Sequence, residues 1–280
     1  MKVIEEIDRL RKILDKHCSK NETIGYVPTM GYFHEGHLSL IDIAREKAEV
    51  VVVSIYVNPT QFGPDEDLEK YPRDMNRDAK LARERGVDYI FHPDNDEMYS
   101  ENFSTYVQNI ELSDKLCGAT RDNHFRGVTT IVSKMFNIIN PDFAVFGQKD
   151  YQQAIIIRRM VDDLNFNIDI VLGDIIREED GLATSSRNVY LSEEEREQAP
   201  ILYQALKEAK KKVENGETSA SYIKEFIHDK INETEKAEIE YVAIVNNKNL
   251  EEVEEVSEGV FAAVAVWFGE TRLIDNIILK

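Results

Sequence analysis

The β-branched run VVVVSI at residues 50–55, in which Ser54 is the one polar residue, constrains the fold of this chain more than any other feature. Strands that are covered on both faces carry such β-branched runs, whereas a half-exposed antiparallel strand alternates apolar and polar residues. The segment 49–58 therefore predicts an inner strand of a parallel sheet. A shorter apolar strand is expected at 23–29 and an amphipathic helix at 37–48, so residues 23–58 predict one strand–loop–helix–strand unit.

The alternation of strands and helices continues along the first two thirds of the chain. The expected elements are an N-terminal helix at 3–14, helices at 74–86, 126–141 and 150–164, and strands at 87–93, 142–147 and 167–178. Such alternation predicts an α/β fold with a doubly wound parallel sheet.

The pattern changes after about residue 177. We expect a long helix at 192–216, with Ser192 as its N-cap, and a second helix at 219–233. Strand-rich segments follow at 239–246 and 260–279. These elements predict a smaller C-terminal α+β domain.

Composition excludes several classes of function for the 280-residue chain. It has 34 Lys and Arg against 53 Asp and Glu, a net charge of −19, which argues against a broad nucleic-acid surface. No apolar run is long enough to span a membrane, and the charged N-terminus does not resemble a secretory signal. The two cysteines, Cys18 and Cys117, predict neither a disulfide framework nor a metal site, so we expect a cytoplasmic protein.

The most informative segment is PTMGYFHEGHLSLI at 28–41, which joins a predicted strand to a helix. Within it, His34 and His37 lie three residues apart beside Gly31 and Gly36. Glycines let the backbone approach a ligand, and a helix N-terminus favours an anion whose oxygens an imidazole N–H can bind. Because ligands of doubly wound sheets lie at the carboxyl ends of the strands, we expect a phosphate site here. A metal-binding histidine pair and a capped helix with surface histidines are the alternatives.

Two later segments carry cationic side chains, and that of Lys149 would face the same crevice as His37. Lys149 follows the predicted strand at 142–147 and offers a point charge to a phosphate at a second strand-to-helix junction. A loop near residue 186 carries Ser185, Ser186 and Arg187, which suit multidentate phosphate contacts. Each segment alone is also typical of solvated surface, but basic side chains at two strand-to-helix junctions, that of the histidines and that of Lys149, together favour an anion site.

Amide and basic side chains gather in two further loops. Asn58 and Gln61 follow the buried strand, and amides bind neutral or carboxylate substrates without adding charge. Arg121, His124 and Arg126 lie beside glycines. They predict either a mobile basic loop near an anion or a surface loop, and the sequence favours neither.

In combination, these motifs resemble a known enzyme family. PTMGYFHEGH is similar to the HIGH-type motif of the adenylate-forming nucleotidyltransferases, and TSSRN is similar to the counterpart of their KMSKS loop. With VNPTQFGPDEDLEKYPRD, HFRGV, FGQKDYQQ and DGLATSSRNVYLS, they resemble the pantoate–β-alanine ligases over almost the whole chain. The chain departs from that pattern at Thr184, where Met is common, and at Asn123, where Gly is common.

The resemblance implies an architecture and an assembly. It implies a Rossmann-like nucleotide- and pantoate-binding domain at 1–176 and a C-terminal lid domain at 177–280. It further implies a cytoplasmic homodimer that uses ATP as a substrate, with Mg2+ bound to the ATP phosphates.

The resemblance also assigns site residues. It places pantoate at Gln61 and Gln153, and β-alanine at Gln61. It implies that ATP contacts the backbone near Ile176. The implied ATP-binding residues are Met30, Gly31, Tyr32, Phe33, His34, Glu35, Gly36, His37, Gly147, Gln148, Lys149, Asp150, Ile176, Thr184, Ser185, Ser186 and Arg187.

The implied reaction needs no protein nucleophile. The pantoate carboxylate attacks the α-phosphorus of ATP, which gives pantoyl adenylate and pyrophosphate, and the β-alanine amine then displaces AMP. Since two anions have to meet, the site needs donors aimed at the developing charge, and His34, His37, Lys149 and Arg187 are the expected catalytic residues. The family's proton donor corresponds to His37, although hydrogen bonding to phosphate would explain the position of this residue equally well.

Three other functions are compatible with such a fold. An adenylyltransferase that leaves AMP on a phosphorylated acceptor would call for more Arg and Lys than the amides Gln61 and Gln153 provide. A fragment of a class I aminoacyl-tRNA synthetase conflicts with the acidic charge and the lack of a basic anticodon module. A non-catalytic nucleotide sensor would bind ATP without releasing pyrophosphate, and the presence of both histidines, Lys149 and Arg187 argues against it.

Overall fold

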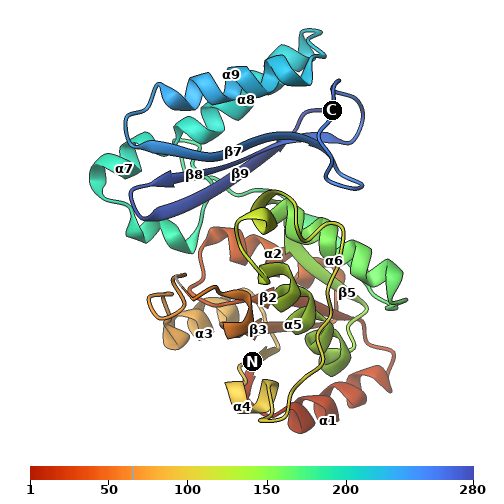
Figure 1. Ribbon diagram of the computed structural model, residues 1–280. Coiled ribbons are helices and arrows are strands. Elements are labelled where there is room, and N and C mark those ends of the chain that lie inside the picture. Colours follow the sequence, from red (N-terminus) through yellow and green to blue (C-terminus); the bar gives the residue numbers. More distant parts are fainter. Residues whose placement is uncertain (65) are drawn as a thin grey trace.

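The computed structural model describes residues 1–64 and 66–280, which form two sheets and their covering helices (Figure 1). The first sheet has six parallel strands in the order β1-β4-β3-β2-β5-β6. The second has three antiparallel strands in the order β7-β8-β9. The predicted α/β class with a smaller C-terminal α+β part is therefore confirmed.

The elements of the parallel-sheet lobe follow the predicted alternation. The strands are β1 (Lys2–Ile4), β2 (Ile24–Thr29), β3 (Val50–Ile55), β4 (Tyr89–Phe91), β5 (Phe143–Gly147) and β6 (Asp169–Gly173). The helices are α1 (Ile7–Cys18), α2 (Glu35–Lys47), α3 (Met75–Glu84), α4 (Asn95–Met98), α5 (His124–Ile139) and α6 (Tyr151–Asp163). Short 3-10 turns are η1 (Pro59–Gln61), η2 (Leu116–Ala119) and η3 (Gln148–Asp150).

The C-terminal lobe begins after β6 with an irregular segment. Its elements are η4 (Ser186–Tyr190), α7 (Glu193–Gln198), α8 (Ile201–Glu214), α9 (Ala220–Asn232), β7 (Ala237–Asn246), β8 (Val260–Phe268) and β9 (Thr271–Ile278). No helix that the structure describes is long and apolar enough to cross a membrane.

The surroundings of strand β3 explain why its sequence is almost entirely apolar. It lies between β2 and β4, and all six of its residues are buried. Val50 and Val52 belong to the core under α1, α5 and α6, whereas Val51 and Val53 belong to the core under α2 and α3. Helices therefore cover both faces of the sheet, and the apolar residues of β3 face apolar side chains. Ser54, its polar residue, shares a hydrogen bond of 2.7 Å with the Tyr26 hydroxyl.

Two predicted helices are wrong in part. Val3 and Ile4, which fit a helical period with the residues after them, form the edge strand β1 and pair with Ile90 and Phe91 of β4. The burial of Ile4 against the sheet prevails over the local periodicity, and α1 starts only at Ile7.

The predicted long helix at 192–216 is two helices. Ser192 caps α7 in a reciprocal capping box with Glu195, as the sequence indicates. Pro200 separates α7 from α8, because a proline has no N–H to donate to the preceding turn.

The three-stranded sheet has an apolar core on each face. One face packs against α8 and α9, with Val264 and Ile227 among its fully buried residues. The opposite face packs against the parallel-sheet lobe, where Phe261 contacts the ring of Tyr151 at 4.8 Å between ring centroids. The two lobes therefore share a hydrophobic interface.

The strand order locates the ligand crevice. Chain order runs outward from β2 through β3 to β4 on one side, and from β5 to β6 on the other. Between β2 and β5 the direction reverses, so the loops after these strands diverge and leave a crevice at the carboxyl edge of the sheet.

We expect Gly127→Ala to destabilise the protein even though alanine favours helices. A Cβ atom on Gly127 would lie 2.3 Å from the main-chain oxygen of Thr60, so α5 and η1 would have to separate. The expected cost is about 1–3 kcal/mol in the free energy of urea unfolding, which outweighs the propensity gain of about 1 kcal/mol. Asn137→Ala, on the exposed side of the same helix, is the control and should change stability little. Equal stabilities of the two variants would contradict this packing argument.

Candidate active site

The crevice between β2 and β5 holds a cavity of about 230 Å3. Most of the residues expected from the sequence line it: Met30, His34, Gly36, His37, Gln61, Gly147, Lys149, Asp150, Gln153, Ile176, Thr184, Ser185, Ser186 and Arg187. A larger cavity of about 1390 Å3 between the lobes shares Lys149, Ser185 and Arg187 with it. Segments that are far apart in the sequence thus surround one space.

Five of the expected ATP-binding residues lie beside the cavity lining. Phe33 is fully buried in the core under α2 and α3. Glu35 is exposed and lies 3.2 Å from Arg85, and Gln148 lies behind the lining against Asn276. The other two, Gly31 and Tyr32, form the turn before α2 and have positive φ angles.

His34 is the N-cap of α2, and this role fixes its tautomer. Its Nδ1 atom accepts a hydrogen bond from the Gly36 N–H at 3.1 Å, so Nδ1 carries no proton and Nε2 is the donor of the neutral ring. A Cβ atom on residue 36 would lie 2.9 Å from the His34 ring, which explains the glycine there. The ring of His34 stacks at 4.1 Å on His37, whose Nδ1 atom is buried without a partner among the described residues.

The surroundings favour neutral imidazoles at the site. Burial, together with the nearby charge of Lys149, lowers the pKa of His34 to about 4. Burial, then His34 and Lys149, lowers the pKa of His37 well below its usual value. Both rings are therefore hydrogen-bonding groups rather than cations near neutral pH.

Asp78 holds the turn before α2, a role that no local sequence pattern indicates. Its carboxylate, on α3 and only 1% exposed, accepts hydrogen bonds from the N–H groups of Tyr32 at 2.6 Å and Phe33 at 2.7 Å. Burial raises the pKa of Asp78. An aspartate within a charged helix is typical of solvated surface, and only the fold brings it to this loop.

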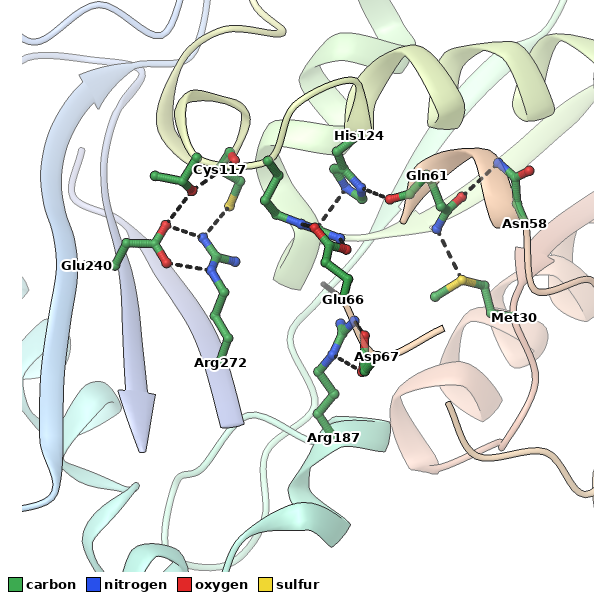
Figure 2. A network of polar contacts seen from close by, with 12 residues as sticks. Met30, Asn58, Gln61, Glu66, Asp67, Cys117, His124, Arg187, Glu240 and Arg272 are labelled. Carbon is green, nitrogen blue, oxygen red and sulfur yellow. Dashed lines mark hydrogen bonds and ion pairs between the residues drawn. The ribbon is translucent and has the colours of Figure 1, made fainter. Parts of the chain in front are cut away.

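The amide of Gln61 lies between two other site residues (Figure 2). Asn58 Nδ2 donates to Gln61 Oε1 at 3.2 Å, and Gln61 Nε2 lies 3.1 Å from the sulfur of Met30. The Nδ1 of His124 lies 2.8 Å from the Gln61 carbonyl oxygen, and Arg121 lies 3.0 Å from Nε2 of the same ring. Asn58 and His124 thus support the position of Gln61. Of the three basic residues predicted in this segment, Arg121 and His124 line the cavity, whereas Arg126 lies outside the lining, over the ring of Tyr106.

Two guanidinium groups at the site are held by carboxylates of one loop (Figure 2). Arg187 binds both oxygens of Asp67, at 2.9 and 2.7 Å, and Arg121 binds both oxygens of Glu66, at 2.8 and 2.6 Å. Burial raises the pKa of Asp67, but the bond to Arg187 outweighs it and holds that pKa below its usual value. An anion that approaches Arg187 competes with Asp67 for the guanidinium group.

The apolar side of the cavity is a feature that the sequence did not single out. Helix α5 contributes Val128, Ile131, Val132 and Met135 to the lining. In the sequence these residues resemble ordinary core positions, because a helical apolar stripe looks the same whether it meets another element or a ligand. The cavity therefore combines an apolar wall with polar groups, as is usual for small-molecule sites.

The described residues hold no cluster of three or more His, Cys, Asp or Glu side chains that could bind a metal ion. His34 and His37 stack on each other rather than converging on a common point, and His34 Nδ1 is already occupied by the helix cap. The arrangement favours the anion-binding interpretation of this pair over the metal-binding one.

We expect His34 to remain neutral well below pH 6, with a titration midpoint near pH 4 in 15N–1H NMR spectra of the imidazole. Because its pKa is lower in the folded than in the unfolded chain, the unfolded chain takes up the proton first, and stability falls as the pH drops from about 6.5 toward 4. His34→Asn, which keeps an N-cap acceptor but cannot titrate, should weaken this loss in urea unfolding at pH 7 and pH 5. A midpoint near 6.5 would contradict the interpretation.

Comparison with known proteins agrees with the fold and the site. A family model for pantoate–β-alanine ligase matches residues 2–278. Pantothenate synthetases of Thermotoga petrophila and Acetivibrio thermocellus are 55% identical over 279 residues and 52% identical over 280, each with 100% of both chains covered.

Solved structures agree as well. That of pantothenate synthetase from Thermus thermophilus matches with a TM-score of 0.95 and 42% identity over 100% of both chains. A pantoate–β-alanine ligase from Francisella tularensis, complexed with β,γ-ATP and β-alanine, matches with a TM-score of 0.84 and 32% identity over 100% of this chain and 98% of that one. The chain therefore belongs to the pantoate–β-alanine ligase family of enzymes.

Proposed function

We propose that this enzyme activates pantoate with ATP as pantoyl adenylate and then transfers the pantoyl group to β-alanine, releasing AMP and pyrophosphate. The observation that carries the proposal is the single cavity at the β2–β5 crevice, which joins phosphate-binding groups (His34, Lys149) to uncharged amides (Gln61, Gln153). The related Francisella tularensis enzyme, complexed with β,γ-ATP and β-alanine, supports it.

The first step forms a bond between a pantoate carboxylate oxygen and the α-phosphorus and breaks the bond to the β-phosphate bridging oxygen. Pyrophosphate leaves with that electron pair, so negative charge builds up on the leaving phosphates. Lys149, Arg187 and the Nε2–H of His34 are the donors that stabilise this charge. Holding the two reactants in line supplies much of the remaining acceleration.

His37 acts in this step as a neutral hydrogen-bond donor. Burial, then His34 and Lys149, lowers the pKa of His37 well below its usual value, which favours the neutral ring near neutral pH. A neutral imidazole still offers one N–H to a phosphate oxygen. This role accounts for the place of the histidine at a helix N-terminus and needs no proton transfer.

In the second step the neutral amine of β-alanine attacks the acyl carbon of the adenylate. A C–N bond forms, the C–O bond to AMP breaks, and the amine loses a proton to solvent. We assign Gln61 to both acids, because its amide is held by Asn58 at one end and can donate without adding charge. Gln153 is assigned to pantoate, and the apolar wall on α5 suits the two methyl groups of that substrate.

The proposed ATP site comprises the segments at 30–37 and 147–150, the backbone at Ile176, and the loop at 184–187. Thr184 donates its N–H to the Ile176 oxygen at 2.9 Å, which ties two of these segments together. Since the described residues offer no metal cluster, we propose that Mg2+ accompanies the ATP phosphates.

The larger organisation is also proposed. Residues 1–176 bind nucleotide and pantoate, and 177–280 cover them as a lid, in line with the large cavity between the lobes. The assembly is a homodimer in the cytoplasm, where unpaired Cys18 and Cys117 would remain reduced. Sedimentation of a monomer at micromolar concentration would contradict the dimer.

The test is incubation with ATP, Mg2+ and pantoate, with and without β-alanine. Pyrophosphate should appear without β-alanine in an amount close to that of the enzyme, and AMP should appear continuously only when β-alanine is added. Pyrophosphate release that needs β-alanine would contradict the adenylate order, and ATP binding without any pyrophosphate would indicate a sensor.

We expect Gln153→Ala to weaken pantoate binding more than ATP binding. Loss of an amide that hydrogen-bonds a carboxylate costs about 1.5–3 kcal/mol, so the pantoate KM should rise at least about tenfold. Steady-state kinetics for all three substrates measure this, and Gln204→Ala on the exposed side of α8 is the matched amide control. A raised KM for ATP, with the KM for pantoate and kcat unchanged, would show that Gln153 does not bind pantoate.

We expect Asp67→Asn to lower the KM for ATP, because Arg187 would no longer be held by a carboxylate that competes with phosphate. Removal of a partly buried ion pair of this kind corresponds to about a 3- to 10-fold change. The exposed Asp8→Asn makes the same change in net charge and is the control. An ATP KM that rises in Asp67→Asn would show that the aspartate helps to place Arg187 instead.

A further inference from the structure

The turn that carries Lys149 is held by a residue of the C-terminal sheet. Asn276 of β9 directs Nδ2 at the main-chain oxygens of Gln148 and Lys149, at 2.9 Å each. Its Oδ1 lies 3.4 Å from Nε2 of Gln148. With only 4% of its surface exposed, Asn276 makes these bonds away from solvent.

This contact constrains the backbone from which the lysine extends. The amide of Asn276 has two N–H groups, and it gives one to each of two consecutive carbonyls, which fixes both peptide planes of the turn. The Lys149 ammonium lies 3.9 Å from Asp150, longer than a hydrogen bond, and so that pair restrains it weakly. The position of the main chain therefore decides where the flexible side chain can place its charge.

Asn276 is itself firmly placed. Its main chain pairs with Ala263 of β8, and its N–H donates to Asp275 Oδ1 at 2.7 Å. Asp275 points to the other face of β9 and binds Arg177 at 2.6 and 2.9 Å. Arg177 precedes the loop that ends at Arg187. One strand thus holds both cationic segments of the site, the Lys149 turn through Asn276 and the Arg187 loop through Arg177.

We propose that Asn276 is a positioning residue for adenylate formation, which acts by fixing the Lys149 turn against the C-terminal sheet. The inference rests on the proposed role of Lys149 at the ATP phosphates. It assigns the C-terminal lobe a part in the first chemical step in addition to covering the site.

The first experiment measures pyrophosphate release in a single turnover with ATP, Mg2+ and pantoate, without β-alanine. In Asn276→Ala the rate should fall by about 10- to 100-fold, the range expected when a catalytic group is displaced by about 1 Å. The KM for β-alanine should stay within about twofold, because the variant leaves Gln61 untouched. If Asn276→Ala does not fold, Asn276→Ser, which can keep one of the two bonds, takes its place in the same comparison.

Asn246→Ala is the matched control. Asn246, at the end of β7 in the same sheet, accepts from the main-chain N–H groups of Lys248 and Asn249 at 3.0 Å each and is remote from the Lys149 turn. It should lower the melting temperature without slowing pyrophosphate release by more than about twofold. If Asn276→Ala and Asn246→Ala slowed pyrophosphate release by the same factor at the same loss of stability, the effect of Asn276 would be structural only. The proposal would then be overturned.

A double-mutant cycle decides whether Asn276 acts through Lys149. In a Lys149→Ala background, Asn276→Ala should slow the reaction by less than about twofold more, since the group that it positions is gone. An equal loss in both backgrounds would overturn the inference. If pyrophosphate release is slow in Lys149→Ala but normal in Asn276→Ala, only the inference about Asn276 is overturned. If it is normal in Lys149→Ala, the proposed role of the lysine is overturned as well.

Discussion

The reversal of strand order between β2 and β5 is the constraint on which the site depends. A parallel sheet that is covered on both faces has free space only at its edges and ends, and at the carboxyl end this space opens where neighbouring loops diverge. The loop after β2 brings the two stacked histidines there, and the turn after β5 brings Lys149. The turn after β3 adds Gln61. The chemistry of the cavity thus follows from three strand ends, and the apolar residues that bury β3 on both faces hold them in register.

The charges at the site have to be considered together with the acidic composition of the chain. A chain with a net charge of −19 has to bind two anions. It does so with few free positive charges, because both histidines are kept neutral and Arg187 is bound by Asp67. Asp67 therefore occupies the position in which the proposed phosphate contact of Arg187 would form, and under that proposal an anion would compete with this carboxylate. Such an exchange costs less than desolvating a bare guanidinium, because the pair is already partly withdrawn from water.

Much of this structure could be predicted from the sequence. The β-branched run of β3 indicated the parallel sheet, and the HxGH and SSR motifs indicated the residues that line the cavity. The edge strand β1 could not be predicted, because Val3 and Ile4 fit a helical period and only pairing with β4 decides between the two. Asp78 and Asn276 were missed for a related reason. Each acts on main-chain atoms of a segment far away in sequence, and local patterns carry no sign of such contacts.

The two lobes are joined by apolar packing and by an ion pair, and these two kinds of contact differ in how easily a bound anion could replace them. The sheet of the C-terminal lobe meets α6 through an apolar core that includes Phe261 and Tyr151, and uncovering such a core costs free energy in proportion to its area. The pair of Arg187 with Asp67, in contrast, joins the lobes through two side chains that are partly exposed, so a bound anion can compete for it. Because β9 also holds the Lys149 turn, a rigid rotation of the whole lobe would carry that turn away from the histidines. Adjustment to substrates is therefore expected at this ion pair, with the apolar contact and the β9 anchor unchanged.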